Sequence, residues 1–131
     1  VAAVARLFDE LEAAFGGIDI LVNNAAIVQV KPFLELTDDD WDRVLETNLK
    51  SVFLCCRAAL PAMLAQGSGC IINIASELAY LGRAQYAAYT AAKGGVITLT
   101  RSLAREFAPT VRVNGIAPGP TDTPMLRSEL A

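Results

Sequence analysis

Apolar positions along the chain alternate between a helical spacing and short continuous runs. Near the start they recur at positions 4, 7, 8, 11, 14 and 15, the spacing of an amphipathic helix, which Gly16 and Gly17 end. Three continuous apolar runs follow, and such runs are typical of strands buried inside a parallel sheet. They are IDILVNNAA at 18–26, CIINIAS at 70–76 and VRVNGIA at 111–117.

Long helices are predicted in the two intervals between these strands. Thr37 is a good N-cap, and we expect the first long helix to run from 38 to about 64. The second should run from about 88 to 107. Thr123 followed by Pro124 predicts an N-cap with proline at the first helical position, and therefore a last helix.

This alternation of strands and long helices predicts an α/β fold within a single domain over residues 1–131. We expect a parallel sheet with right-handed crossovers, covered by helices on both faces. Ligands of such sheets bind outside the carboxyl ends of the strands. Those ends carry the small and polar segments NNAA, AS and APGPTDT, which predicts a ligand site at that edge.

Composition narrows the classes of function. Hydrophobic residues make up 53% of the chain and charged ones 19%, enough for a substantial core. No apolar run reaches the roughly 18 residues of a membrane span, so we expect no membrane partner. The net charge of −3, without a cluster of Lys or Arg, argues against nucleic acid. The first residues lack a signal-peptide layout, which favours a cytoplasmic protein.

Two groups of possible metal ligands have simpler interpretations. Cys55, Cys56 and Cys70 are odd in number and show no CxxC spacing, which favours reduced, buried core thiols over a metal or redox site. The acidic residues 38–40 fall in the first turn of a predicted helix, where the helix dipole favours negative charge. The chain has no histidine, so any acid–base catalysis needs another group.

Tyr89 and Lys93 are candidates for that group. They are four residues apart on the predicted helix 88–107 and therefore share one face. An ammonium beside a phenol stabilises the phenolate and so makes the tyrosine a usable proton donor or acceptor. The spacing alone is weak support, because an exposed pair of side chains on a helix is the competing interpretation.

Two further polar residues strengthen this interpretation. Ser76 stands at the carboxyl end of the second strand, where a loop can bring its hydroxyl beside the phenol, and the two could hold a substrate oxygen. Asn48 lies within ETNLKSVF, where a better helix former is expected. A solvent-facing asparagine is the alternative interpretation of that position.

Five motifs in register resemble the short-chain dehydrogenase/reductase (SDR) family. They are DILVNNAA, TNLKSVF, IINIAS, YTAAK and RVNGIAPGPTDTPM, and together they cover essentially the whole chain. The resemblance implies a Rossmann-like, doubly wound parallel sheet, present in part through its central and C-terminal βαβ units. It implies an oxidoreductase that moves hydride between NAD or NADP and a small-molecule alcohol or ketone.

The resemblance also assigns roles to residues. The catalytic tetrad would be Asn48, Ser76, Tyr89 and Lys93. Tyr89 would pass the proton, Ser76 would orient the substrate oxygen, Lys93 would tune Tyr89 and hold the nicotinamide ribose, and Asn48 would support a water-linked relay. The cofactor would also be contacted by Asn24, Ala25, Ala26, Pro118, Gly119, Thr121 and Thr123. Tyr80 and Tyr86 would be left to pocket lining or packing.

The sequence departs from the family pattern at three places. Ala26 stands where the family has glycine, and Thr121 stands where a branched aliphatic residue is common. The Gly-rich turn that holds the pyrophosphate has no counterpart, since Gly16 and Gly17 lie between a helix and a strand. We therefore expect a fragment of the family's domain, lacking its first three strands and its last, and inactive alone.

Three hypotheses of function remain open at this point. The leading one is the oxidoreductase. A sugar-nucleotide epimerase or dehydratase could use the same tetrad, and a non-catalytic oligomerisation or binding module could keep only the helices. The apolar residues around both long helices further predict a homodimer or homotetramer formed through them.

Overall fold

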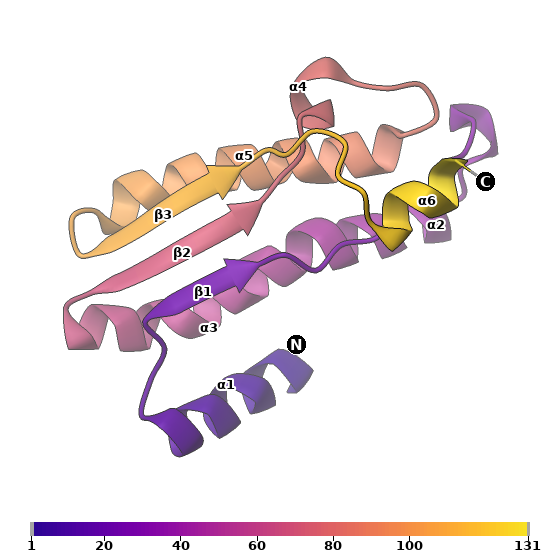
Figure 1. Ribbon diagram of the computed structural model, residues 1–131. Coiled ribbons are helices and arrows are strands. Elements are labelled where there is room, and N and C mark those ends of the chain that lie inside the picture. The colour runs from indigo at the N-terminus through magenta and orange to yellow at the C-terminus, as the bar shows by residue number, and fades with distance from the viewer. Residues whose placement is uncertain (1, 131) are drawn as a thin grey trace.

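The computed structural model describes residues 2–130, and the side chains of 2–127. The chain alternates between helices and strands, as the sequence predicts (Figure 1). The elements are α1 (Ala2–Phe15), β1 (Ile20–Asn23), η1 (Phe33–Glu35), α2 (Asp38–Leu45), η2 (Glu46–Lys50), α3 (Ser51–Gln66), β2 (Gly69–Ile74), α4 (Leu78–Leu81), α5 (Ala87–Phe107), β3 (Val111–Ile116) and α6 (Pro124–Leu130). The short helices η1 and α4 were not predicted.

The three strands form one parallel sheet in the order β1-β2-β3. Val22 pairs with Ile72, and Ile72 in turn pairs with Asn114. The predicted parallel sheet and the α/β class are therefore confirmed. All three strands point the same way, so their carboxyl ends meet at one edge (Figure 1).

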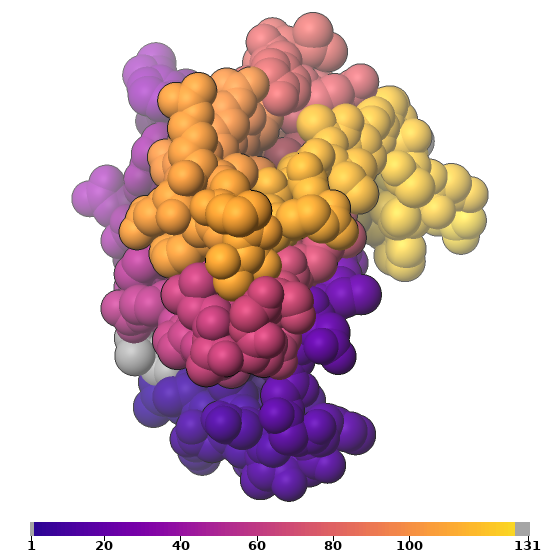
Figure 2. Space-filling model, turned by 90° about the vertical axis from the view of Figure 1, so that its left-hand side faces the viewer, coloured from indigo at the N-terminus to yellow at the C-terminus, as the bar shows by residue number. Residues whose placement is uncertain are grey.

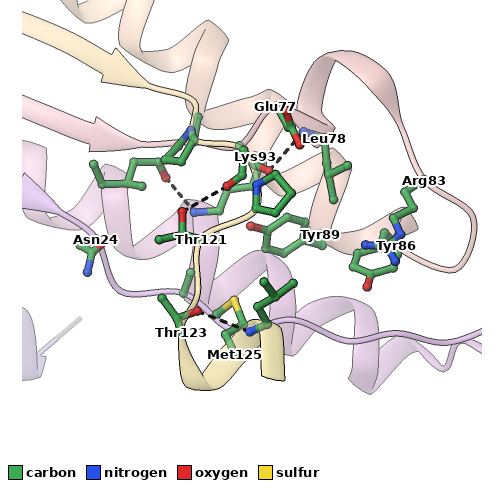
Figure 3. Close-up of a pocket in the computed structure, with 18 of the residues that line it drawn as sticks. Asn24, Glu77, Leu78, Arg83, Tyr86, Tyr89, Lys93, Thr121, Thr123 and Met125 are labelled. Atoms are coloured by element: carbon green, nitrogen blue, oxygen red, sulfur yellow. Dashed lines mark hydrogen bonds between the residues drawn. The ribbon is translucent and has the colours of Figure 1, made fainter. Parts of the chain in front are cut away.

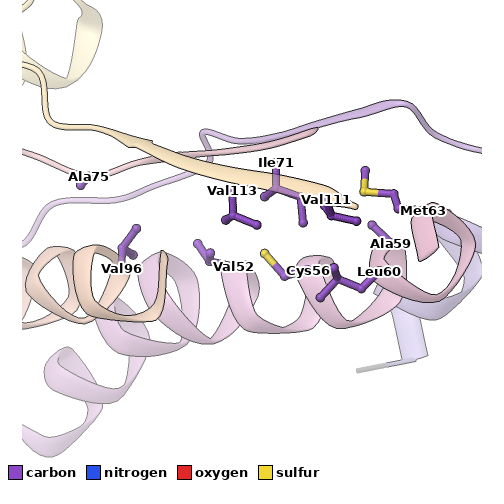
Figure 4. Packing of buried hydrophobic residues seen from close by; sticks show 10 residues of the cluster. All are labelled: Val52, Cys56, Ala59, Leu60, Met63, Ile71, Ala75, Val96, Val111 and Val113. Atoms are coloured by element: carbon purple, nitrogen blue, oxygen red, sulfur yellow. The ribbon is translucent and has the colours of Figure 1, made fainter. Parts of the chain in front are cut away.

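The core lies between the sheet and the two long helices α3 and α5. Ile71, Val111 and Val113 project from the strands toward these helices and are buried. Figure 4 shows these side chains meeting those of the helices in one layer. From the helices the buried cluster takes Val52, Cys56, Ala59, Leu60, Met63 and Val96.

The opposite face of the sheet is open among the described residues. Ile20 is 62% exposed and Val22 is 52% exposed, although both belong to a strand. The expectation that helices cover both faces is therefore wrong for residues 2–130. The strand order explains this. The two right-handed crossovers, from β1 to β2 and from β2 to β3, both move in the same direction across the sheet, so their helices lie on the same face.

Helix α1 lies beyond the outer edge of β1 and packs on α3 (Figure 1). Figure 2 shows this N-terminal part of the chain at one end of the molecule. An apolar groove of about 440 Å³ runs between α1 and β1 and is lined in part by Leu11, Phe15 and Ile20. No strand of the described chain pairs with the outer edge of β1.

The stretch Asp38–Gln66 qualifies the expectation about membranes. By length and composition alone it could cross a bilayer, although it contains no unbroken apolar run of that length. Its buried side chains, among them Val52 and Met63, pack against the sheet. A core helix of a globular protein can be equally long and apolar. The apolar composition of this stretch is therefore explained by its packing against the sheet.

The start of α2 shows the role of Asp40, one of the three acidic residues in its first turn. Thr37 Oγ1 accepts a hydrogen bond from the Asp40 amide at 3.1 Å, and the Asp40 carboxylate accepts one from the Thr37 amide at 3.2 Å. Lys31 donates to the same carboxylate at 2.7 Å. The lysine and the threonine together lower the pKa of Asp40 to about 2. The predicted N-cap at Thr37 is thus confirmed, as a reciprocal capping box.

The cysteines are free thiols, as expected, but only Cys56 is fully buried. Burial raises the pKa of its thiol to about 11, so it stays protonated near neutral pH. Cys55 and Cys70 are half-buried, and the prediction of three buried core thiols is wrong for these two. Cys70 lies on β2, the strand whose one face is open, which explains its exposure.

Adjacent glycines on α5 give a test of this packing. A Cβ atom added at Gly95 would lie 2.7 Å from Cδ2 of Leu49, whereas one added at Gly94 meets nothing within 4 Å. In the full gene product that contains these residues, we expect Gly95→Ala to lower the free energy of unfolding by about 1–3 kcal/mol through overpacking. Gly94→Ala should raise it by about 0.5–1 kcal/mol, the usual gain of helix propensity.

Urea unfolding of the two variants measures both effects. Equal effects of the two substitutions would contradict the close packing of α5 against Leu49.

Candidate active site

A pocket of about 640 Å³ opens at the edge where the carboxyl ends of the strands meet. Its walls come from the segments that follow β1, β2 and β3, from α5 and from the start of α6 (Figure 3). The edge that the sequence predicts as the ligand side thus carries the pocket. Its lining includes Asn24, Ala25, Ala26, Ser76, Glu77, Leu78, Arg83, Tyr86, Tyr89, Lys93, Pro118, Gly119, Thr121, Thr123, Met125 and Leu126.

Backbone hydrogen bonds hold two of these walls together. The amide of Ala75 donates to the carbonyl of Ile116 at 2.7 Å, which extends the pairing of β2 with β3. The amide of Glu77 donates to the carbonyl of Pro118 at 3.0 Å. The segment after β2 therefore lies directly beside the segment after β3, although the two are far apart in sequence.

Lys93 is the buried cation of the pocket. It reaches the pocket from α5 and is only 3% exposed. Its ammonium donates to the backbone carbonyl of Ile74, at the end of β2, at 2.7 Å. Burial lowers the pKa of Lys93 from 10.5 to about 8, because the charged form loses its hydration.

Tyr89 is half-buried and lies next to Lys93, as their spacing on the helix predicts. The ammonium of Lys93 is 5.8 Å from the centre of the Tyr89 ring. An ammonium at this range attracts a phenolate through a medium of reduced dielectric. The alternative of an exposed surface pair is wrong, because Lys93 is buried and both side chains line the pocket.

The other two tyrosines differ sharply from each other. Tyr86 is 3% exposed, lines the pocket and meets Tyr89 edge to face, with ring centres 6.3 Å apart. Tyr80 is 63% exposed and is not part of the pocket lining. The expected role in lining or packing is therefore confirmed for Tyr86 and is wrong for Tyr80, which lies on the surface turn α4.

Ser76 is buried at the pocket wall, immediately after the end of β2. Its Oγ accepts a hydrogen bond from the amide of Leu78 at 3.2 Å. Because the oxygen acts as the acceptor in this bond, the hydroxyl proton can be directed toward a ligand oxygen. The local turn thus leaves the hydroxyl proton of Ser76 available for donation.

Asn48 is fully buried, so the alternative of a solvent-facing residue is wrong. It lies in the π-helical segment η2, where the ordinary helical hydrogen-bond ladder is interrupted. Its Oδ1 accepts from the amide of Ile27 at 2.8 Å, and its Nδ2 donates to the carbonyl of Ile27 at 2.8 Å. The Asn48 side chain does not line the pocket. It holds the loop that follows Ala26, and Ala26 is part of the pocket wall.

The residues expected to contact a cofactor gather at this pocket. Asn24, Ala25 and Ala26 form one part of its wall and the segment from Pro118 to Thr123 forms another. A Cβ atom at Gly119 would lie 3.2 Å from Oε2 of Glu77, so the wall at Gly119 is closely packed. Thr121 Oγ1 donates to the Gly119 carbonyl at 3.2 Å, so the Thr121 side chain helps to hold this part of the wall.

Small side chains, two threonine hydroxyls and a buried ammonium suit a nicotinamide and its ribose. We therefore find that the residues present fit the nicotinamide half of such a cofactor.

Several residues of the pocket were not singled out from the sequence, among them Arg83, Leu78 and Met125. Arg83 precedes the buried Tyr86, and its guanidinium carbon lies 4.5 Å from the centre of that ring. Leu78 and Met125 add apolar surface near the same tyrosines (Figure 3). The sequence offered one signal for Arg83, namely that it is the single arginine between the end of the second predicted strand and the second long helix.

Comparisons with known proteins agree with this arrangement. The family model described as short chain dehydrogenase matches residues 1–131. A cis-4-hydroxycyclohexanecarboxylate dehydrogenase of Sinomonas cyclohexanicum is 47% identical over 126 residues, which are 95% of this chain and 51% of that protein. A 3-oxoacyl-[acyl-carrier-protein] reductase of Staphylococcus aureus is 44% identical over 117 residues, 88% of this chain and 48% of that protein.

A solved structure gives the same result in three dimensions. A gluconate 5-dehydrogenase of Burkholderia cenocepacia, crystallised with NADP and tartrate, superposes with a TM-score of 0.94 at 40% identity. The match covers 98% of this chain and 51% of that one. The chain thus spans about half the length of the relatives that it matches.

The burial of Lys93 predicts a pH-dependent stability. Because its pKa in the folded chain, about 8, lies below the ordinary 10.5, the unfolded chain binds more protons between these values. The cost of burying the charge is fully present below pH 8 and disappears above pH 10.5. The Lys93 contribution to the unfolding free energy should therefore rise by about 2 kcal/mol between pH 7 and pH 9.5.

Urea unfolding at these two pH values, for wild type and Lys93→Met of the gene product, isolates this contribution. The rise should be absent from the variant and present in Lys50→Met, which removes an exposed lysine. An equal pH dependence of wild type and Lys93→Met would contradict it.

Proposed function

The chain belongs to the short-chain dehydrogenase family, and we propose that it forms the catalytic part of an NAD(P)-dependent oxidoreductase. Residues 1–131 would be part of one Rossmann-like domain. The substrate would be a small alcohol or ketone. The observation that carries this proposal is the convergence of Ser76, Tyr89 and Lys93 on one pocket at the strand ends.

Tyr89 would exchange the proton with the substrate oxygen. In a chain without histidine, its phenol is the ionisable hydroxyl group that reaches both the pocket and a buried cation. Lys93, 5.8 Å from the ring centre, favours the phenolate while it carries its charge. Ser76 would donate its hydroxyl proton to the same substrate oxygen and hold it in place as negative charge develops.

The cofactor would be NAD or NADP. Bound beside the substrate, it would accept the hydride of an alcohol or supply one to a ketone. Lys93, Thr121 and Thr123 would hold its nicotinamide half, together with Asn24, Ala25, Ala26, Pro118 and Gly119. The NADP in the Burkholderia structure supports this assignment.

Asn48 would act from behind the pocket as a support. Its two hydrogen bonds to Ile27 hold the loop beside the proposed cofactor site. The π-helical backbone at Asn48 is a feature that often occurs at functional sites. This placement is compatible with the proposed water-linked relay toward Lys93.

The relatives favour redox chemistry over the two other hypotheses. The dehydrogenase and the reductase that match are named for hydride transfer, not for epimerisation or dehydration of sugar nucleotides. Two of the matches involve a carboxylate: the name of the Sinomonas enzyme includes hydroxycyclohexanecarboxylate, and the Burkholderia structure contains bound tartrate. A hydroxy acid or keto acid is therefore a reasonable substrate class. The burial of Lys93 beside Tyr89 in the pocket, with the lowered pKa of the lysine, favours a catalytic role over a non-catalytic module.

The gene product would be a cytoplasmic homodimer or homotetramer. Helix α3 buries one side on the sheet and leaves Phe53 and Leu64 exposed. Exposed apolar side chains of this size on a long helix support burial against a second copy of the protein. Pairing of the long helices across a two-fold axis would cover it.

Replacing Tyr89 by Phe tests the catalytic assignment. The variant keeps the ring and loses the proton carrier, so kcat of the gene product should fall by a factor of about 10²–10⁴. Cofactor affinity, measured by fluorescence titration, should change little. Tyr80→Phe, at an exposed tyrosine outside the pocket, is the matched control. A Tyr89→Phe enzyme within about tenfold of wild type would reject the assignment.

Light scattering of the gene product tests the proposed assembly. At micromolar concentration we expect the mass of a dimer or a tetramer. Phe53→Glu, on the exposed side of α3, should shift it toward the monomer, whereas Leu34→Glu, at an exposed residue of η1, should not. A monomeric wild type would contradict the proposal.

A further inference from the structure

Part of the pocket is lined by apolar side chains that do not belong to the hydrophobic core. They come from two segments far apart in the chain, namely Leu78 at the start of α4, and Met125 and Leu126 near the start of α6. Neither buried cluster of the described chain includes any of the three, and none of them packs against a cluster as a half-buried neighbour. Figure 3 shows Leu78 and Met125 on opposite sides of Tyr89 in that view. Apolar surface therefore flanks the proposed catalytic tyrosine.

The backbone holds Leu78 in a fixed position relative to the reacting group. Its amide donates to Ser76 Oγ at 3.2 Å, and its carbonyl accepts from the amide of Gly82 at 2.9 Å. Ser76 Oγ is the atom that would hold the reacting oxygen of the substrate. Since Leu78 is bonded directly to that atom, its side chain can contact the carbon atoms next to the reacting carbon.

This apolar lining would select between hydrocarbon and hydroxyl groups of a ligand. Leu78 is half-buried, so it has apolar surface left that a ligand can cover. A CH₂ group placed there is removed from water, which is favourable. A hydroxyl group placed against Leu78 and Met125 would lose its hydration, and an aliphatic side chain offers no hydrogen bond in return.

We propose that the substrate carries a hydrocarbon body, an alkyl chain or an alicyclic ring, beside its carbinol or carbonyl carbon, and that Leu78 is the specificity residue that contacts this body. The inference rests on the proposed oxidoreductase function and narrows its substrate class. On oxidation the carbinol carbon would lose its hydrogen as hydride to the oxidised cofactor, and the hydroxyl proton would pass to Tyr89. A polyhydroxylated acid, such as a sugar acid, would be a poor substrate.

Two matched pairs of alcohols test the substrate class in the gene product, with NAD and with NADP. 4-Hydroxycyclohexanecarboxylate and gluconate each carry a carboxylate, but only the first has a hydrocarbon body. Cyclohexanol and trans-cyclohexane-1,2-diol differ by a hydroxyl group beside the reacting carbon. We expect kcat/KM to favour the less hydroxylated member of each pair, by about 10–100-fold for cyclohexanol over the diol.

Variants of Leu78 test its role in this preference. Leu78→Asn keeps the approximate size of the side chain and introduces an amide, so KM for cyclohexanol should rise by about tenfold and its advantage over the diol should fall to within about threefold. Leu78→Met keeps the volume and the apolar character and should retain the wild-type preference. Leu81→Asn is the matched control and should change none of these constants, because Leu81 lies on the same helix, is 73% exposed and does not line the pocket.

Calorimetric binding separates this inference from the proposed function. If wild type oxidises none of the four alcohols, the proposed function fails, and the affinities of the two acids for wild type and Leu78→Asn still decide the inference. Tighter binding of 4-hydroxycyclohexanecarboxylate than of gluconate, with a smaller difference in Leu78→Asn, supports it. Oxidation of gluconate alone would leave the function intact and overturn the inference. Preference for the diol, an equal loss for all substrates in Leu78→Asn, equal affinities of the two acids, or no measurable binding of either would also overturn it.

Discussion

The position of the Lys93 ammonium is the constraint on which the rest of the site depends. A lysine that is 3% exposed must find hydrogen-bond partners inside the protein, and it finds the carbonyl of Ile74 at the end of β2. This bond ties α5 to the strand end and thereby sets where Tyr89 lies, one helical turn earlier. Two turns further on, Thr100 Oγ1 accepts a hydrogen bond from the side-chain Nδ2 of Asn73 at 2.9 Å, so the helix is anchored to the same strand twice.

Buried polar bonds continue across the sheet from this anchor. Asn73 accepts from Asn23 of β1 at 2.8 Å, so one chain of hydrogen bonds connects β1, β2 and α5. Such a chain fixes the register of elements that apolar packing alone would let slide, because each misalignment would leave a buried polar group without a partner. The backbone hydrogen bonds from Ala75 and Glu77 extend this strand register into the walls of the pocket.

The same architecture explains the pocket and the open face. Strands in the order β1-β2-β3 bring three loops to one edge, which creates the pocket. With both connecting helices on one face, that order leaves Ile20 and Val22 of the other face uncovered. This chain spans about half the length of its relatives. It nevertheless has a well-defined pocket at one edge of the sheet, while one face of the sheet stays open among the described residues.

The sequence by itself determined what depends on near neighbours and on pattern. The spacing of Tyr89 and Lys93 places both on one helical face, the residues around Thr37 and Thr123 start helices, and apolar runs define the strands. Only the tertiary structure decided which polar groups are buried. Asn48 and a solvent-facing asparagine look alike in sequence, as do Tyr80 and Tyr86, and the approach of Arg83 to the pocket depends on the path of a loop. Burial, open faces and pocket membership depend on segments far apart in the chain, and local periodicity carries no information about where those segments meet.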